Sequence, residues 1–478
     1  MAKKSYANEL AIDCYDHLLD LITLLESCED IERIKIESLK QKGDCLKTIG
    51  EWKQAKESYI EALKIADKIK DQDRGVECKI SIGDIFKLES AYKDALDLYL
   101  ECLQIYDERG DEKGYCESLG KIGSAYTNMA EYDKAMKYLE EMRHIAEKLN
   151  DNGLLSTLYG NIGSTHYGRG ELKEGLEYFK KKLNIKEEEG DLLEIGYTLV
   201  NLASIYVRLK DFENSKRACN RALEIVERTG DKLMEQNALG KLGIAYTEEG
   251  EYAKGLEYYK KKLSLSEKMG DKKSIAYVAN NIGELYKEKG EYDKALSYYQ
   301  KDVEISKDLE DKRGYAITMG NMGNLYKLKN ELDKAEKEYD KTIQIAREKD
   351  IKDVLSYFLS CKADLYFQKG LIEKAEVLNK EALEIGEKIK MQQAIFSGNL
   401  LKAKILSTTD KERGISILKE MLEEDYNQPE EAKLIYELYK ISGEENYKQD
   451  ALEYYKKIYE KNPSIHYKEI IDELTDDF

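Results

Sequence analysis

The chain has 478 residues, of which 42% are hydrophobic and 36% are charged, with only two prolines and a formal net charge of −18. A single compact domain rarely exceeds about 250–300 residues, so the length indicates several domains or a repeat array, and the apolar content argues against wholesale disorder. The scarcity of proline favours one long run of helices, and the acidic balance argues against nucleic acid or an anionic membrane surface as a partner.

The first 35 residues predict one capping helix, because residues 6–27 are rich in apolar side chains. No stretch approaches the roughly 18 uninterrupted apolar residues of a membrane span, and the first ten residues lack the apolar segment of a signal peptide. The eight cysteines are scattered without paired spacing, which is typical of reduced thiols. We therefore expect a cytoplasmic protein that does not enter the membrane.

A 40-residue period follows. One position holds a small residue every time: Gly43, Gly83, Gly123, Gly163, Ala203, Gly243, Gly283, Gly323, Ala363 and Ala403. Aromatic residues dominate three and sixteen positions later, and a small residue stands twelve later, as in Tyr286, Ala295 and Tyr299. Each period predicts two amphipathic helices. Gly-Asp pairs at 110–111, 190–191, 230–231 and 270–271 predict the end of one helix and the cap of the next.

This pattern resembles the tetratricopeptide repeat in its 40-residue form, like the repeats of kinesin light chains, spindle-orientation adaptors and bacterial Rap-type peptide receptors. The resemblance implies an all-α fold, a right-handed superhelix of about ten to eleven helix pairs. It places an N-terminal cap at 1–35, nine 40-residue units at 36–395 and a degenerate unit at 396–428. A unit of the 34-residue type follows at 429–463, and a C-terminal capping helix with an acidic tail at 464–478.

The sequence offers little for catalysis. Cys14 and His17 lie three residues apart, but there is no second pair to complete a zinc site. Phosphate-binding loops, nucleophile elbows and His-Glu-x-x-His motifs are missing. His166 and Cys219 occupy positions that hold aromatic rings in other repeats, so we interpret both as core residues. We expect no catalytic residue, no metal ligand and no cofactor, and therefore no enzyme.

The resemblance also implies that the first helix of each pair lines a concave groove, into which the residue two before each small position points. Those positions are Gln41, Ser81, Lys121, Asn161, Asn201, Lys241, Asn281, Asn321 and Cys361. The same offsets add Asn237, Tyr277, Asn280, Asn324, Tyr167, Arg208, Lys287 and Lys327. An amide can bond a peptide backbone, but it can equally bond a neighbouring turn, so each asparagine stands as either a ligand contact or a scaffold residue.

The favoured hypothesis is a protein-interaction scaffold that holds a partner protein or peptide along the groove between Lys121 and Lys327. Asn161, Asn201, Asn281 and Asn321 would bond its backbone, and Lys121 and Lys241 would select acidic side chains. The alternative is a peptide-responsive regulator of the Rap kind. That kind normally carries an N-terminal output domain, and about 35 residues before the repeats are too few for one. The sequence alone predicts neither the identity of the partner nor the oligomeric state.

Overall fold

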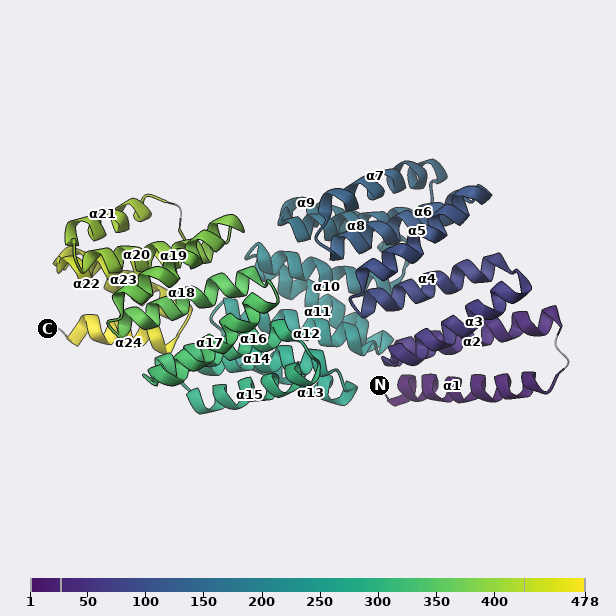
Figure 1. Ribbon diagram of the computed structural model, residues 1–478, viewed down its shortest axis with the longest axis horizontal. Helices are drawn as coiled ribbons and strands as arrows, with labels where there is room; N and C mark the ends of the chain where they lie inside the picture. The colour runs from purple at the N-terminus through teal and green to yellow at the C-terminus, as the bar shows by residue number, and fades with distance from the viewer. Residues whose placement is uncertain (1, 26–27, 425, 477–478) are drawn as a thin grey trace. The chain divides into compact units, whose positions relative to one another are not determined.

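A computed structural model describes residues 2–25, 28–424 and 426–476, and over these residues it contains 24 α-helices and no strand (Figure 1). The predicted all-α fold is confirmed. Eleven consecutive helix pairs, α2 to α23, lie between α1 and α24 along the chain. The last two residues of the acidic tail, 477–478, lie outside the described residues. The chain divides into two compact units, Met1–Lys241 and Leu242–Phe478, which we describe separately.

The first unit contains eleven complete helices. They are α1 Ala2–Thr23, α2 Glu29–Ile49, α3 Trp52–Ile69, α4 Gln72–Leu88, α5 Tyr92–Arg109, α6 Glu112–Asn128, α7 Tyr132–Leu149, α8 Asn152–Arg169, α9 Leu172–Glu189, α10 Leu192–Arg208 and α11 Phe212–Thr229. The boundary between the two units falls within α12, Lys232–Glu248.

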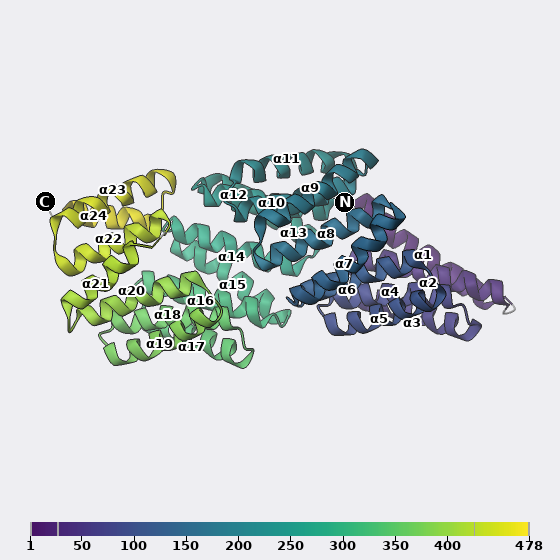
Figure 2. The same ribbon diagram turned by 90° about the horizontal axis from the view of Figure 1, so that it is seen from above.

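The second unit continues the alternation of helices. It contains α13 Tyr252–Met269, α14 Lys272–Glu288, α15 Tyr292–Asp308, α16 Lys312–Leu328, α17 Leu332–Glu348, α18 Lys352–Gln368, α19 Ile372–Lys388, α20 Gln392–Ser407, α21 Lys411–Leu422, α22 Gln428–Ser442, α23 Glu445–Lys461 and α24 Ile465–Asp476. Consecutive helices pack side by side in each unit, as the view from above also shows (Figure 2).

The two helices of a pair meet where the small residue of the first faces a side chain of the second. A Cβ added to Gly43 would lie 2.5 Å from Cε1 of Tyr59, which is fully buried. The Tyr59 hydroxyl donates a hydrogen bond to Oδ1 of Asp44 at 2.6 Å, so the buried phenol keeps a polar partner. The same contact recurs at Gly83, Gly243, Gly283 and Gly323, each against the tyrosine sixteen residues later.

The turns between helices use a left-handed residue about every twenty positions. Gly270 (φ 68°) ends α13, and Asp271 accepts a hydrogen bond from the backbone N–H of Ser274 at the start of α14. All four predicted Gly-Asp pairs behave in this way, which confirms their role as helix ends and caps.

One contact in the second unit joins segments that are far apart in sequence. The Tyr252 hydroxyl donates to Oδ1 of Asn462, and the Ser464 hydroxyl donates to Oε2 of Glu288 at 2.7 Å. Ile465 packs on Gly290. The turn between α23 and α24 therefore contacts the beginning of α13 and the end of α14.

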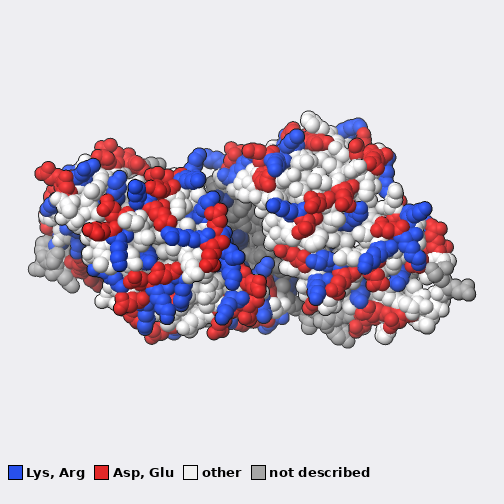
Figure 3. Space-filling model, in the orientation of Figure 1, with Lys and Arg blue, Asp and Glu red and all other residues white. Residues whose placement is uncertain are grey.

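The described helices do not include one that is both long and apolar enough to cross a membrane. On the face shown in Figure 3, side chains of both charges are interspersed over the helices.

Candidate functional site

Each unit carries a polar hollow that is lined mainly by the first helices of successive pairs. The first-unit hollow has a volume of about 570 Å³ and is lined by residues of α4, α6, α7, α8, α9 and α10. The second-unit hollow has a volume of about 600 Å³, and α16, α18, α20, α22, α23 and α24 line it. In both, successive first helices bring their polar side chains to one surface.

Three lysines, Lys327, Lys404 and Lys433, line the second-unit hollow together with four carboxylates, those of Asp364, Glu437, Glu469 and Glu473. Lys327 pairs with Asp364, and the Nζ of Lys404 lies 2.9 Å from Oε1 of Glu437 and 3.9 Å from Oδ1 of Asp364. Burial raises the pKa of Asp364, but the two lysines outweigh it and hold that pKa below its ordinary value. Asp364 and Glu437 are therefore already neutralised within the protein.

Lys433 is the third of these lysines, and it forms no ion pair or hydrogen bond with any described residue. Burial lowers the pKa of its ammonium group, the negative charge of Asp364 opposes this effect, and the positive charge of Lys404 adds to it. His466 lines the same hollow, and burial followed by the charge of Lys433 lowers the pKa of its imidazole. The hollow thus contains a buried lysine that forms no direct ion pair with a described residue, although the charges of Asp364 and Glu437 act on it.

The first-unit hollow has the same character. Lys121 lies 2.9 Å from Oδ1 of Asp84, and Lys182 lies 2.8 Å from Oε2 of Glu194. Lys87, by contrast, donates only to the Ser124 hydroxyl, at 3.2 Å, and has no carboxylate partner in the described ranges. Burial lowers the pKa of Lys87 despite the nearby charge of Asp84.

Several amides that the sequence placed in the groove bond to the protein itself. Asn161 donates from Nδ2 to the carbonyl oxygen of Gly120 at 2.9 Å. Asn280 donates to Oγ1 of Thr318 at 2.6 Å and to Oδ2 of the buried Asp302 at 3.3 Å. Asn321 donates to Oδ1 of Asn280 at 3.4 Å, and Asn324 accepts from the Tyr339 hydroxyl at 2.7 Å.

The charged groove candidates are also mostly engaged. Arg208 donates to the carbonyl of Tyr167 at 2.8 Å and lies over its ring, and Lys287 lies 2.5 Å from Oε2 of Glu284. Lys241 forms no ion pair or hydrogen bond with another residue that the structure describes, and burial lowers the pKa of its ammonium group.

Asn201 and Asn281 form no hydrogen bond with described residues, and Asn201 is exposed. Of the groove candidates from the sequence, Lys121 and Asn161 line the first-unit hollow, and Asn324, Lys327 and Cys361 line the second-unit hollow.

The sequence reasoning missed Lys87, Lys404 and Lys433. Lys87 follows Gly83 by four positions, the offset that Lys287 and Lys327 have from their own glycines, so the period could have found it. Lys433 lies beyond the regular repeats, where no such offset applies. Cys219 is fully buried, as interpreted from the sequence. His166 is only partly buried: its ring stacks on Tyr178 with centroids 5.5 Å apart, and its Nδ1 lies 2.6 Å from Oε2 of Glu171.

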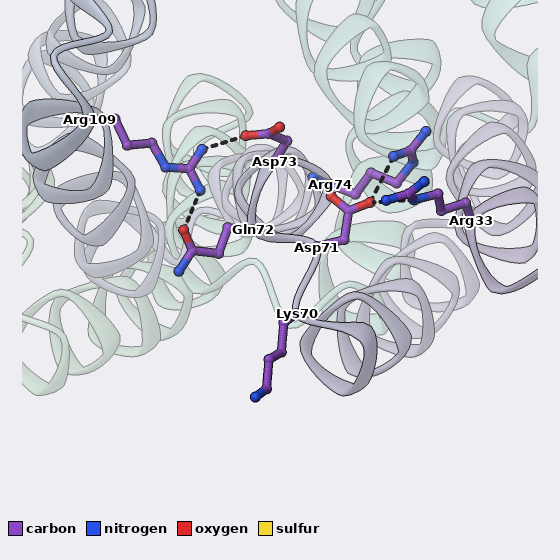
Figure 4. A pocket seen from close by; sticks show the side chains of 7 residues that line it. All are labelled: Arg33, Lys70, Asp71, Gln72, Asp73, Arg74 and Arg109. Atoms are coloured by element: carbon purple, nitrogen blue, oxygen red, sulfur yellow. Dashed lines mark hydrogen bonds and ion pairs between the residues drawn. The ribbon is translucent and has the colours of Figure 1, made fainter. Parts of the chain in front are cut away.

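A third hollow, of about 430 Å³, lies at the turn between α3 and α4 (Figure 4). The arginines that line this hollow form ion pairs with its carboxylates. Asp71 accepts from Nη1 of Arg74 at 2.8 Å and pairs with Nε of Arg33 at 3.5 Å, while Arg109 bonds Asp73 and Gln72. This hollow therefore offers no guanidinium without a partner. No cluster of three or more metal-ligating side chains is found among the described residues.

These features define an α-helical repeat protein with polar hollows on its first helices. Models of the tetratricopeptide repeat match residues 117–141, 194–268 and 274–348. A search of curated proteins returns no match. The matched segments therefore contain tetratricopeptide repeats, as the 40-residue period indicates.

Two solved structures share the fold. One is a signal-transduction ATPase with numerous domains, carrying a tetratricopeptide-repeat sensor, from Pyrococcus horikoshii. It is 18% identical with a TM-score of 0.52, and the match covers 73% of this chain and 55% of that one. This chain thus spans about half of that protein's length. The other is a Rap protein complexed with competence and sporulation factor, which is 14% identical with a TM-score of 0.51, covering 76% of this chain and 98% of that one.

Proposed function

We propose that this protein is a non-enzymatic scaffold that binds an acidic segment of a partner protein along the first helices of its repeats. The observation that supports this most directly is the pair of lysines without carboxylate partners, Lys87 and Lys433, one in each hollow. Confining an unpaired cation at a partly desolvated position destabilises the free protein. A carboxylate supplied by a ligand would offset that cost.

The amides divide into two groups under this proposal. Asn201 and Asn281 are free to bond the backbone of a bound segment, since an amide offers two donors and an acceptor. Asn161, Asn280 and Asn321 chiefly fasten one repeat to the next, and only their remaining donors or acceptors are available to a ligand. The nine repeats proposed at 36–395 would form the binding surface for the partner segment. The units proposed at 396–428 and 429–463 would extend that surface.

A second candidate is a regulator that responds to a short peptide. The contact of the α23–α24 turn with α13 and α14 favours it, because His466, two residues beyond Ser464, lines the second-unit hollow. That hollow is thus bounded by the returning end of the chain and suits a ligand of a few residues. The Rap protein named above was crystallised with competence and sporulation factor, which is the ligand of that protein.

The test selects ligands for the full chain from a random peptide display library and measures their affinities by fluorescence anisotropy. We expect enrichment of aspartate and glutamate. Lys433→Met or Lys87→Met should weaken binding at least tenfold, since a hydrogen bond to a charged group contributes about 1.5–3 kcal/mol. Lys457→Met is the matched control, because Lys457 is exposed on α23 and pairs with Glu453. Peptides without acidic enrichment, or unchanged affinity in both variants, would refute the proposal.

A further inference from the structure

Helix α1 carries two apolar faces, of which only one is covered. The covered face packs on α2 and α3. Ile22 is 7% exposed, Leu19 packs on the cluster around Ile36, and Ile12 packs on the cluster around Leu46. These contacts account for the role of α1 as a cap, and they leave the opposite face of the helix unexplained.

The opposite face is a leucine stripe open to solvent. Leu10, Leu18 and Leu21 are 52%, 38% and 61% exposed, and Leu24 and Leu25, in the turn that follows the helix, are 81% and 58% exposed. Steps of three and four residues place Leu10, Leu18 and Leu21 along one side of the helix, together with the exposed Cys14. We call residues 10, 14, 18, 21, 24 and 25 the α1 stripe.

The α1 stripe differs from the apolar residues that any surface exposes. Fifteen large hydrophobic side chains are exposed in the described parts of the chain. Five of them fall between Leu10 and Leu25, whereas the other ten are spread between Ile34 and Val377. Scattered apolar residues need no explanation, but a contiguous apolar patch marks an interaction surface.

Unpaired acids border the stripe. Asp13 and Asp20 are exposed, lie seven residues apart on one edge of the stripe, and form no ion pair with the described residues, whereas Asp16 pairs with Lys42. Residues 5–32 contain eight acidic residues and no lysine or arginine. Whatever covers the stripe must therefore bring positive charge to its edge.

We propose that the α1 stripe docks an amphipathic helix of another protein, with lysine or arginine flanking its leucine-type stripe. A rise of about 1.5 Å per residue gives the stripe the length of roughly four helical turns, which sets the size of the partner helix. A second copy of this chain fits less well, because antiparallel pairing would bring the acidic edges together. An anionic lipid surface is disfavoured by the same charge.

Two synthetic peptides of about 18 residues probe this surface on the full chain. Both carry the same helical leucine stripe, flanked by lysines in one and by glutamates in the other. Fluorescence anisotropy should show saturable one-to-one binding of the lysine peptide and at least tenfold weaker binding of the glutamate peptide. Equal affinity for both peptides, or no binding of either, would overturn the proposal.

Variants assign the binding to the stripe. Leu10→Ser combined with Leu21→Ser should abolish binding of the lysine peptide. Asp13→Asn combined with Asp20→Asn should lower its affinity severalfold and reduce the preference over the glutamate peptide. Leu371→Ser, at an isolated exposed leucine of the second unit, is the control and should change nothing. Circular dichroism confirms that each variant is folded.

The alternative occupants have distinct signatures. Light scattering that shows a dimer of the wild type, and a monomer of the double serine variant, would assign the stripe to a second copy and overturn the proposal. Binding of the wild type, and not of that variant, to phosphatidylcholine–phosphatidylserine vesicles would assign the stripe to lipid and overturn it as well. These results are independent of the fate of the peptide-binding hollows.

Discussion

In five of the helix pairs, a tyrosine of the second helix decides how large the central residue of the first helix can be. At Gly283, an added Cβ would lie 2.6 Å from Cε1 of Tyr299, and this ring is fully buried with its hydroxyl bonded to Glu284. The ring cannot move aside without giving up that hydrogen bond. This explains why the position is glycine in each of the five pairs with such a tyrosine.

Gly283→Ala should therefore lower the free energy of unfolding by about 1–3 kcal/mol, the range that overpacking of a core produces. Urea unfolding followed by circular dichroism measures it. Gly75→Ala is the control, because the nearest atom to its added Cβ is 3.8 Å away, an ordinary contact. That change should stabilise the helix by about 0.5–1 kcal/mol. A loss at both sites, or at neither, would contradict the explanation.

Asp302 is a buried carboxyl group, and its titration should make the free energy of unfolding depend on pH. Burial raises its pKa above the ordinary value, although hydrogen bonds from Thr318, Ser306 and Asn280 oppose the rise. The folded state then binds the proton more tightly than the unfolded state. The stabilisation by protonation is complete below the unfolded pKa, near about 4, and is lost as the pH rises through the folded pKa.

Asp302→Asn removes this titration and leaves a neutral group of similar shape. The unfolding free energy of the variant relative to the wild type should therefore increase as the pH rises from about 4 to 7, because only the wild type loses stability by ionising there. Chemical unfolding of both proteins at several pH values measures the difference. A constant difference across that range would show that Asp302 titrates as it does in the unfolded chain.

At the scale of the elements, several turns between helices hold a left-handed backbone conformation without the glycine that this conformation favours. The left-handed position is a glycine at Gly110 or Gly270, but Ala130 (φ 58°) and Lys210 (φ 58°) hold the same backbone with a side chain. An L-residue in this conformation carries a cost of roughly 1–2 kcal/mol relative to a right-handed one.

Ala130→Gly should relieve that strain and raise the unfolding free energy by about 0.5–1 kcal/mol, since part of the gain is offset by the entropy of glycine in the unfolded chain. Gly110→Ala is the reverse test. No atom lies within 4 Å of its added Cβ, so any loss there comes from the backbone alone. Thermal unfolding of both variants should move in opposite directions.

The helix pairs could be predicted from the sequence because everything that forms them is local. The spacing from Gly283 to Tyr299, and the Gly270–Asp271 cap, each lie within one period. The hydrogen bonds that the groove asparagines form within the protein could not be predicted in the same way. Asn161 reaches Gly120 across 41 residues, and only the side-chain conformation decides between that carbonyl and a ligand. Lys433 escaped prediction because it lies outside the period that aligns the other candidates.

Over the whole molecule, stability should follow the regularity of the repeats. Helix α21 has 12 residues and buries only Gly414, Leu418 and Met421, whereas its neighbours α20 and α22 have 16 and 15 residues. In an array of repeats, stability is approximately the sum of each unit and its neighbouring interfaces. A short helix with few buried side chains contributes least to that sum.

Hydrogen exchange of the intact protein should therefore show the amides of α21 exchanging faster than those of α20 and α22. Mass spectrometry of peptic fragments from residues 392–442 resolves the three helices. Slowest exchange in α21 would mean that the irregular unit is not the weak point of the array.

The contact between the α23–α24 turn and α13 gives the second unit an unusual folding problem. Most contacts of a helical array join residues a few tens of positions apart, but Tyr252 and Asn462 are separated by 210 positions, and Glu288 and Ser464 by 176. The entropy of closing a loop grows with its length, so this closure becomes favourable only after the intervening helices have shortened the effective loop. The second unit should therefore assemble from neighbouring pairs and acquire its long-range contact last.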